Sequence, residues 1–193
     1  MSPRKVLPAG FYARSPEVVA RELLGKTLVR VIGGERLGGV VVETEAYHGG
    51  GDPASRAYHG RKEYNAAMWE EPGRLFVYNV HKYWMLNVVA HLPGGVGGVL
   101  FRAIEPTAGV EAMMRRRPVR DVRELTSGPG KLSIALGVTR ELNGYPVTDS
   151  GAPVHILDAP PAAGCRTSHR IGVTRDLPEE LRFYADGNRF VSR

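Results

Sequence analysis

A run of seven residues, VVETEAY at positions 41–47, constrains the fold of this chain more than any other stretch. Its β-branched residues favour a strand, in which successive side chains alternate between two faces. Val42, Thr44 and Ala46 share a face that suits a hydrophobic core. The opposite face combines two carboxylates with an aromatic ring, because it carries Val41, Glu43, Glu45 and Tyr47.

Two carboxylates on one strand face need an explanation, because carboxylates are depleted in strands and costly to bury without partners. The strand is therefore either an exposed edge with a solvated face or the wall of a site. A flexible loop, 49–53, follows directly and would let another molecule approach closely. The pattern makes Glu43, Glu45 and Tyr47 candidate site residues and leaves both interpretations open.

The chain of 193 residues is expected to form one domain, residues 1–193, that contains both helices and strands. A helix is expected after Ser15, which can cap it, because Pro16 and Glu17 suit a helix start. Further helices are expected after Thr107 and Ser127. Strands are expected at 27–32, 40–47, 75–80, 99–104, 154–157, 169–173 and 181–184, with the first two forming an antiparallel pair.

The composition is that of an ordinary globular protein, with 42% hydrophobic and 24% charged residues. Neither a membrane-spanning stretch nor a signal peptide is recognised, and the single cysteine, Cys165, fits a reducing compartment. We therefore expect a cytoplasmic protein, associated with the nucleoid if its source is bacterial. The net charge of +6 permits a polyanionic partner without demonstrating one.

Arg102 lies in the middle of an apolar strand and points the same way as Leu100 and Ile104. An arginine in such a position normally needs an acidic partner. Glu43 and Glu45 are the natural candidates, so the sequence predicts an ion pair between these two strands.

Two further stretches are rich in basic or small residues. The segment 81–87, HKYWMLN, mixes basic and aromatic side chains. The segment 127–132, SGPGKL, leads into a helix whose first N–H groups, with Lys131, suit a phosphate, although the Walker spacing is absent. The arginines between 115 and 123 form either a basic patch or a solvated helix end.

The six histidines do not form a recognised metal motif, because H-E-x-x-H is absent and one cysteine excludes cysteine-based zinc sites. His48, Asp52 and His59 could meet around a metal, but loop residues of this kind are more often hydrogen-bonded surface groups. We therefore expect no metal and no cofactor. A serine hydrolase is also disfavoured, since no G-x-S-x-G motif occurs.

Seven motifs, taken in order, resemble those of the alkyladenine (3-methyladenine, methylpurine) DNA glycosylases. The resemblance covers nearly the whole chain, and the ordered set is specific although each motif alone is modest. The motifs are VETEAY at 42–47, DPAS at 52–55, FVY at 76–78, LNVV at 86–89, FRAIEP at 101–106, SGPGKL at 127–132 and RFY at 182–184.

The resemblance implies an α+β fold, a single mixed domain around a curved antiparallel sheet with flanking helices. It implies an enzyme of base excision repair that flips a damaged purine out of duplex DNA and hydrolyses its N-glycosidic bond, without a metal or cofactor. Glu45 matches the glutamate that activates the water. Arg102 matches an arginine that helps to hold this water, and Ile171 matches the residue whose backbone carbonyl also contacts it.

The resemblance also implies a pocket for the flipped base. Tyr47 and Tyr78 match its aromatic walls, and Asn87 matches an asparagine that crowds the exocyclic amine of normal guanine. The chemistry of the residues agrees, since breaking the sugar–base bond builds oxocarbenium character that a carboxylate stabilises while it deprotonates water. A lysine nucleophile has no obvious candidate on the Glu45 strand, so a monofunctional enzyme is expected.

Two departures from the family concern residues that would touch DNA. A histidine contacts the flipped base in the family where this chain has Arg56, which points either into the pocket or outward to a phosphate. The family inserts a tyrosine into the duplex at a turn that is one residue shorter here, so His81 is the nearest match and Tyr83 the alternative. Lys82 and Lys131, with the arginines of 115–123, are candidates for phosphate contacts.

The expected partner is double-stranded DNA that contains damaged purines, bound by a monomer without a membrane. Two other classes of function stay open. A non-catalytic nucleic-acid-binding domain could keep the fold, although it would not need both Glu45 and Arg102. An unrelated hydrolase or transferase could act on small substrates. Salt-dependent binding of duplex DNA would distinguish a DNA-binding protein from such an enzyme.

Overall fold

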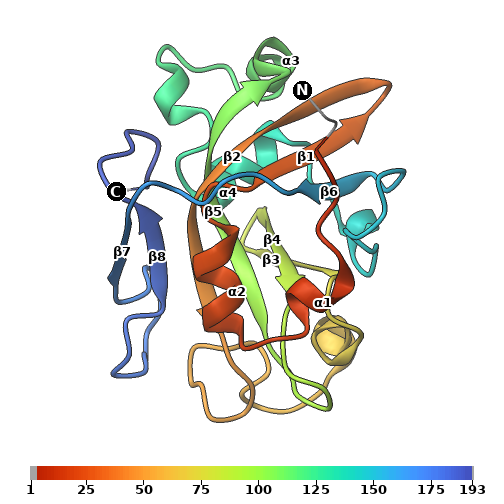
Figure 1. Ribbon diagram of the computed structural model, residues 1–193, viewed down its shortest axis with the longest axis vertical. Coiled ribbons are helices and arrows are strands. Elements are labelled where there is room, and N and C mark those ends of the chain that lie inside the picture. Colours follow the sequence, from red (N-terminus) through yellow and green to blue (C-terminus); the bar gives the residue numbers. More distant parts are fainter. Residues whose placement is uncertain (1–3, 193) are drawn as a thin grey trace.

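The longest strand, β2 (Glu35–Tyr47), lies at the centre of the molecule. A computed structural model describes residues 4–192 (Figure 1). β2 pairs along its first half with β1 (Thr27–Ile32) and along most of its length with β5 (Gly98–Ala108). Beyond the β1 pairing, its free edge is taken by β8 (Arg182–Ala185), which pairs with residues 43–45. The candidate strand is therefore interior, and the exposed-edge interpretation is wrong.

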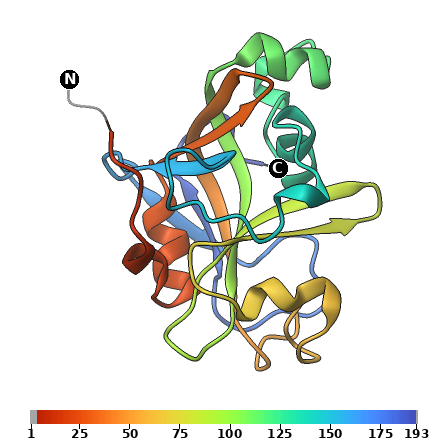
Figure 2. The ribbon, with the colours of Figure 1, turned by 90° about the vertical axis from the view of Figure 1, so that its right-hand side faces the viewer.

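The other strands extend this sheet on both sides, and every pairing is antiparallel. The strand order is β3-β4-β5-β2-β1-β6, and β7 joins through β8. The remaining bounds are β3 Leu75–Val80, β4 Tyr83–Val89, β6 Val154–Leu157 and β7 Cys165–Ser168. The predicted α+β fold around one curved antiparallel sheet is confirmed (Figures 1 and 2).

Short helices surround the sheet. The α-helices are α1 (Ala9–Tyr12), α2 (Pro16–Leu23), α3 (Val110–Arg116) and α4 (Pro129–Ala135), and short 3-10 segments occupy Glu63–Trp69, Val122–Glu124 and Arg140–Leu142. Pro16 and Glu17 begin α2 as predicted, but the Ser15 side chain makes no capping hydrogen bond. The predicted Thr107 cap is wrong, because β5 continues to Ala108. The N-cap of α3 is Gly109 instead, with φ 67°.

The main hydrophobic core lies between α2 and the central strands. Val19, Ala20 and Leu23 of α2 are fully buried, and burying a Val or Leu side chain contributes about 1.5–3 kcal/mol. The Thr44 hydroxyl donates a 2.8 Å hydrogen bond to the Ala20 carbonyl and so fixes α2 against β2. This contact anchors the strand that carries the two glutamates.

The simple alternation predicted for 41–47 fails at one point. Val41 packs in the main core with Ala46, whereas Val42 packs in a separate cluster with Phe190. The β2–β5 register is irregular between Val41 and Thr44, and such an irregularity redirects side chains. The predicted grouping of Val42 with Ala46 is therefore wrong, and both faces of this stretch are buried.

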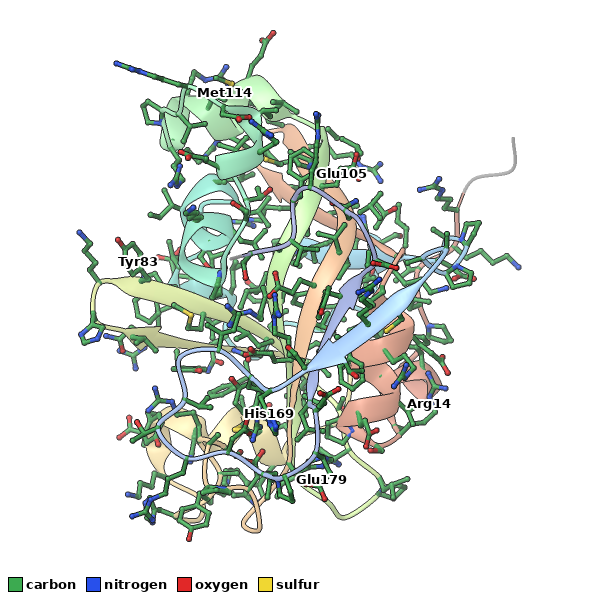
Figure 3. All side chains as sticks on the ribbon, turned by 90° about the vertical axis from the view of Figure 1, so that its left-hand side faces the viewer. Arg14, Tyr83, Glu105, Met114, His169 and Glu179 are labelled. Carbon is green, nitrogen blue, oxygen red and sulfur yellow. The ribbon has the colours of Figure 1, made fainter. Side chains whose placement is uncertain are left out.

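A strand predicted at 169–173 is also absent. β7 ends at Ser168, and the following residues form a loop that leads to β8. The backbone amides of Arg170 and Ile171 donate to the carboxylates of Asp176 and Glu45 instead of joining a strand ladder. Figure 3 shows the labelled His169 and Glu179 on this loop.

The β3–β4 hairpin projects away from the body of the sheet (Figure 2). Its two-residue turn is His81-Lys82, because Val80 pairs with Tyr83. His81 has φ 52°, and it is the single non-glycine residue with positive φ between residues 4 and 192. A positive φ strains a non-glycine residue by about 1 kcal/mol or more, which marks this tip as a candidate functional element.

Of the helices between residues 4 and 192, none combines the length and the apolar character that crossing a membrane would require.

Gly39 tests the close packing of β2 against β5. A Cβ atom on Gly39 would lie 2.0 Å from the Glu105 carbonyl oxygen, so Gly39→Ala should lower the free energy of unfolding by roughly 1–3 kcal/mol. Gly10→Ala is the matched control, because nothing lies within 4 Å of its added Cβ. Urea unfolding of both variants measures the difference, and equal stability of the two would contradict this packing.

Candidate active site

Glu45 is a fully buried carboxylate with three partners. Its Oε1 accepts a 2.8 Å hydrogen bond from the Ile171 amide and lies 3.1 Å from Arg102 Nη1. Its Oε2 accepts a 2.8 Å hydrogen bond from the Tyr47 hydroxyl. A carboxylate offers about four acceptor positions, so these contacts leave it room to accept a further hydrogen bond.

Glu43 holds the arginine that faces Glu45. Its Oε1 accepts bonds from Arg102 Nε at 2.8 Å and Arg182 Nε at 2.7 Å. Ser192 completes the shell through its hydroxyl at 2.8 Å and its amide at 2.6 Å. The predicted ion pair of Arg102 with the two glutamates is confirmed, and Glu43 has a structural position beneath Arg102.

The pKa values of Glu45 and Arg102 are both raised, but for different reasons. Burial raises the pKa of the Glu45 carboxyl, and Arg102, the Ile171 amide and the Tyr47 hydroxyl offset part of this rise. Burial alone would lower the pKa of Arg102, but Glu45 and Glu43 outweigh it and raise the pKa of the guanidinium. Arg102 therefore stays charged, and Glu45 is a stronger base than an exposed glutamate.

A cavity of about 710 Å³ lies against this network. Tyr47, Arg102 and Ile171, the three partners of Glu45, all line it, so Glu45 lies directly behind its wall. Tyr78 lines the cavity and stacks on Phe76 at a centroid distance of 4.9 Å. The structure thus brings the predicted catalytic residues and the predicted aromatic walls together.

Arg56 also lines the cavity, with its guanidinium carbon 4.7 Å from the centre of the Tyr78 ring. Its loop is fixed by the buried Asn65, whose side chain donates to the carbonyls of Arg56 at 2.7 Å and Gly60 at 3.1 Å. Within residues 4–192 Arg56 forms no ion pair. His59 lines the same cavity.

Asn87 lies behind the tyrosine walls, in a narrow recess shared with Tyr47, Arg56 and Tyr78. It is buried, and its amide donates to the carbonyls of Phe76 at 3.0 Å and Met85 at 3.2 Å. These bonds fix the side chain beside the cavity.

A second groove, of about 780 Å³, adjoins the cavity, because Met85, Arg102 and Pro129 line both. Its other lining residues include Tyr83 and Lys131 of the predicted DNA-binding set, together with Arg117, Arg123 and Arg189. Lys82 lies with its Nζ 5.4 Å from the centre of the Tyr83 ring, at the hairpin end labelled by Tyr83 in Figure 3. His81 stands at the hairpin tip.

The sequence did not reveal one buried ion pair beside the site. Arg170 and Asp52 have fully buried side chains and meet at 2.7 Å and 2.8 Å. Asp52 also accepts from the His48 and Ala54 amides, so it is not free to bind a metal. Among residues 4–192, no cluster of three or more histidine, cysteine or acidic side chains suits a metal ion.

The antiparallel sheet carries a cavity walled by tyrosines, and a buried carboxylate of raised pKa lies behind it. Such a cavity can stack a planar ring beside a proton acceptor. The sequence model of one family, methylpurine-DNA glycosylase (MPG), matches residues 10–189. The chain belongs to this family, which confirms the resemblance found in the sequence.

Named relatives span nearly the whole chain. A relative from Aeropyrum pernix is 44% identical over 192 residues, which cover 98% of this chain and 94% of the relative. One from Rhodopseudomonas palustris (strain HaA2) is 44% identical and covers 94% and 88%. One from Oceanobacillus iheyensis is 37% identical and covers 97% and 96%. Each is named "Putative 3-methyladenine DNA glycosylase".

Asp52→Asn should make the fold less stable at neutral pH and less sensitive to acid. Burial alone would raise the pKa of Asp52, but the Arg170 guanidinium and two backbone amides outweigh it and lower this pKa. A carboxyl with a lowered folded pKa stabilises the fold above its unfolded pKa, about 3.9, and this contribution is lost as pH falls through the folded pKa. Urea unfolding between about pH 2 and pH 7 measures the difference.

The control for this variant is Asp186→Asn, which removes an exposed ion pair with Arg166. It should change the unfolding free energy by less than about 1 kcal/mol. If Asp52→Asn keeps the acid dependence of the wild type, the buried ion pair does not stabilise the fold as described.

Proposed function

We propose that this protein removes damaged purines from double-stranded DNA by hydrolysing the N-glycosidic bond with a water activated by Glu45. The observation that carries the proposal is the buried Glu45 carboxylate, held by Arg102 and the Ile171 amide behind a cavity walled by tyrosines. Membership of the methylpurine-DNA glycosylase family supports the same reaction.

Glu45 has the properties that the water-activating step needs. Burial raises the pKa of Glu45 and so strengthens it as a base, whereas the Arg102 guanidinium acts the other way and favours the anionic form. The same negative charge would stabilise the oxocarbenium character that develops on the sugar as the base departs. Ile171 contributes its amide to Glu45, and its carbonyl is proposed to hold the water.

The cavity is proposed to receive the damaged base after it flips out of the duplex. Flipping costs a few kcal/mol, and stacking on Tyr47 and Tyr78 offsets part of this cost. Asn87 is proposed to exclude normal guanine by crowding its exocyclic amine. No lysine is found among the residues that line the cavity between 4 and 192, so the enzyme is proposed to be monofunctional.

The DNA would lie across the β3–β4 hairpin and the second groove. Lys82 and Lys131, with Arg117 and Arg189 of the groove, are proposed to contact phosphates, whereas Arg123 of the groove is paired with Asp121. His81 at the strained tip, or Tyr83 next to it, is proposed as the wedge that fills the vacated stack. We propose a monomer that works in the cytoplasm, on the nucleoid if the source is bacterial.

Glu45→Gln should abolish excision and leave DNA binding intact. Glutamine keeps the size of the side chain but cannot accept the proton, so the single-turnover rate should fall by at least about 100-fold. The measurement is excision from duplexes with one damaged purine, scored as abasic sites, beside a binding titration on the same duplexes.

Glu105→Gln is the matched control, because Glu105 lies on β5 and binds Asn188 instead of a cavity residue. It should excise at the wild-type rate. Near wild-type excision by Glu45→Gln would refute the role of Glu45 in activating water. Salt-dependent duplex binding by a wild-type protein that excises no base would favour the non-catalytic DNA-binding alternative.

Arg56 is proposed to bias the choice of base. It lies over Tyr78 at the cavity, which favours the pocket orientation over the phosphate orientation. Arginine only donates hydrogen bonds and is always charged, so it favours bases with acceptors such as the O6 and N7 of hypoxanthine. A cationic base such as 3-methyladenine would be disfavoured.

Arg56→His, assayed near pH 8 where histidine is neutral, should raise the 3-methyladenine to hypoxanthine rate ratio by about fivefold. Arg61→His, in the same loop but outside the cavity lining, is the control. If Arg56 contacts a phosphate instead, both rates fall together and the salt dependence of binding becomes shallower. An unchanged ratio and unchanged salt dependence would reject both orientations.

A further inference from the structure

One buried arginine ties together three segments around the cavity. Arg170 donates to Asp52 through Nη1 and Nη2, at 2.7 Å and 2.8 Å. It also donates to Asp176 Oδ1 through Nε at 2.8 Å and Nη2 at 2.6 Å. Asp52 belongs to the loop after β2 and Asp176 to the loop between β7 and β8, so Arg170 clamps these two loops together.

The same guanidinium reaches the end of the central strand. Nη1 donates to the Ala46 carbonyl at 2.9 Å, and the guanidinium carbon lies 4.6 Å from the centre of the Tyr47 ring. A guanidinium packed on an aromatic face stabilises one orientation of the ring. Arg170 therefore supports the cavity wall from behind.

Two of the three contacts made by Glu45 depend on what Arg170 holds. The residue next to Arg170 is Ile171, whose amide donates to Glu45 Oε1 at 2.8 Å. The ring beneath Arg170 is that of Tyr47, whose hydroxyl donates to Glu45 Oε2 at 2.8 Å. The third contact, Arg102, is fixed separately by Glu43.

We propose that Arg170 is a positioning residue for the base-removal reaction: clamped by Asp52 and Asp176, it holds the Ile171 amide and the Tyr47 hydroxyl on Glu45. This inference rests on the proposed function of Glu45. Arg170 does not touch the reacting atoms. It acts on the reaction through Glu45, by setting the position and the protonation of that carboxylate.

The consequence follows from the charges that surround Glu45. Arg102 approaches it from β5, Glu43 and Tyr47 share its strand, Tyr78 lies on β3, and Arg182 on the paired strand β8 is bound to Glu43. Releasing the Ile171 amide changes none of these charged groups. It removes a donor that favours the anionic carboxylate, so the pKa of Glu45 should rise further. Arg170→Gln, by contrast, also removes the Arg170 cation from Asp52 and Asp176, so Arg170→Lys, which keeps that charge, separates the effect of the amide from the effect of the charge.

The first test uses the protein without DNA. In ¹⁵N-labelled wild-type protein, the Ile171 amide should resist hydrogen exchange and should follow the titration of Glu45. In Arg170→Gln we expect exchange at this amide to be at least about tenfold faster and its response to pH to be lost. Unchanged exchange and an unchanged pH response in the folded variant would overturn the proposal.

The second test is the pH profile of single-turnover excision. In Arg170→Gln the acid limb, where Glu45 becomes protonated, should move to higher pH by about one unit. The rate at the plateau should fall by about tenfold or more because the site is misaligned. A purely structural arginine would lower the active fraction and leave the midpoint of this limb unchanged, which would refute the positioning role.

The control is Arg166→Gln, four residues earlier, which breaks an exposed ion pair with Asp186 and should change neither reading. If Arg170→Gln fails to fold by its melting curve, Arg170→Lys and Asp52→Asn replace it. The lysine keeps the charge but loses the two-pronged bond, so both readings should move in the same direction by less. A wild-type protein that excises no base would refute the proposed function, whereas the amide measurement would still decide the role of Arg170.

Discussion

The structure depends on a buried set of charges in which two glutamates of β2 face two arginines. Glu43 binds Arg102 and Arg182, and Arg102 continues to Glu45. Removing one member of such a set leaves an uncompensated buried charge, which typically costs about 3–5 kcal/mol. Glu43 is surrounded by Arg102, Arg182 and Ser192, so its role is to hold these groups in place. Glu45 is then the carboxylate next to the cavity.

This network explains why the sheet is arranged as it is. Both edges of β2 must be covered to keep water from the glutamates, and β5 and β8 do this on opposite sides. Arg102 comes from β5 and Arg182 from β8, so each covering strand also supplies a counter-charge. Ser192 closes the remaining side of Glu43. The pairing of β5 and β8 with β2 therefore both forms the sheet and brings the charged side chains together.

The central strand and the Arg102 ion pair could be predicted because both depend on local sequence patterns. The period-two run at 41–47 predicted the strand, and an arginine on an apolar strand face predicted its pairing with the glutamates. The irregular register near Glu43, which separates Val41 from Val42, depends on the partner strand and leaves no local mark. The Arg170–Asp52 pair spans 118 residues, so neither residue indicates the other in sequence. The strand predicted at 169–173 was wrong for the same reason, since distant carboxylates bind that segment.

If Glu45, held by Arg102, activates the water that cleaves a glycosidic bond in duplex DNA, the products are a free base and an abasic strand with an intact backbone. The most direct measurement incubates the wild-type protein with duplexes that carry single damaged purines and scores strand breaks before and after alkali. We expect breaks to appear only after alkali, at the damaged position, because hydrolysis leaves an intact abasic strand. Breaks without alkali would indicate a lysine-based lyase, and the absence of any alkali-labile site with every damaged purine tested would refute the proposed hydrolysis by a Glu45-activated water.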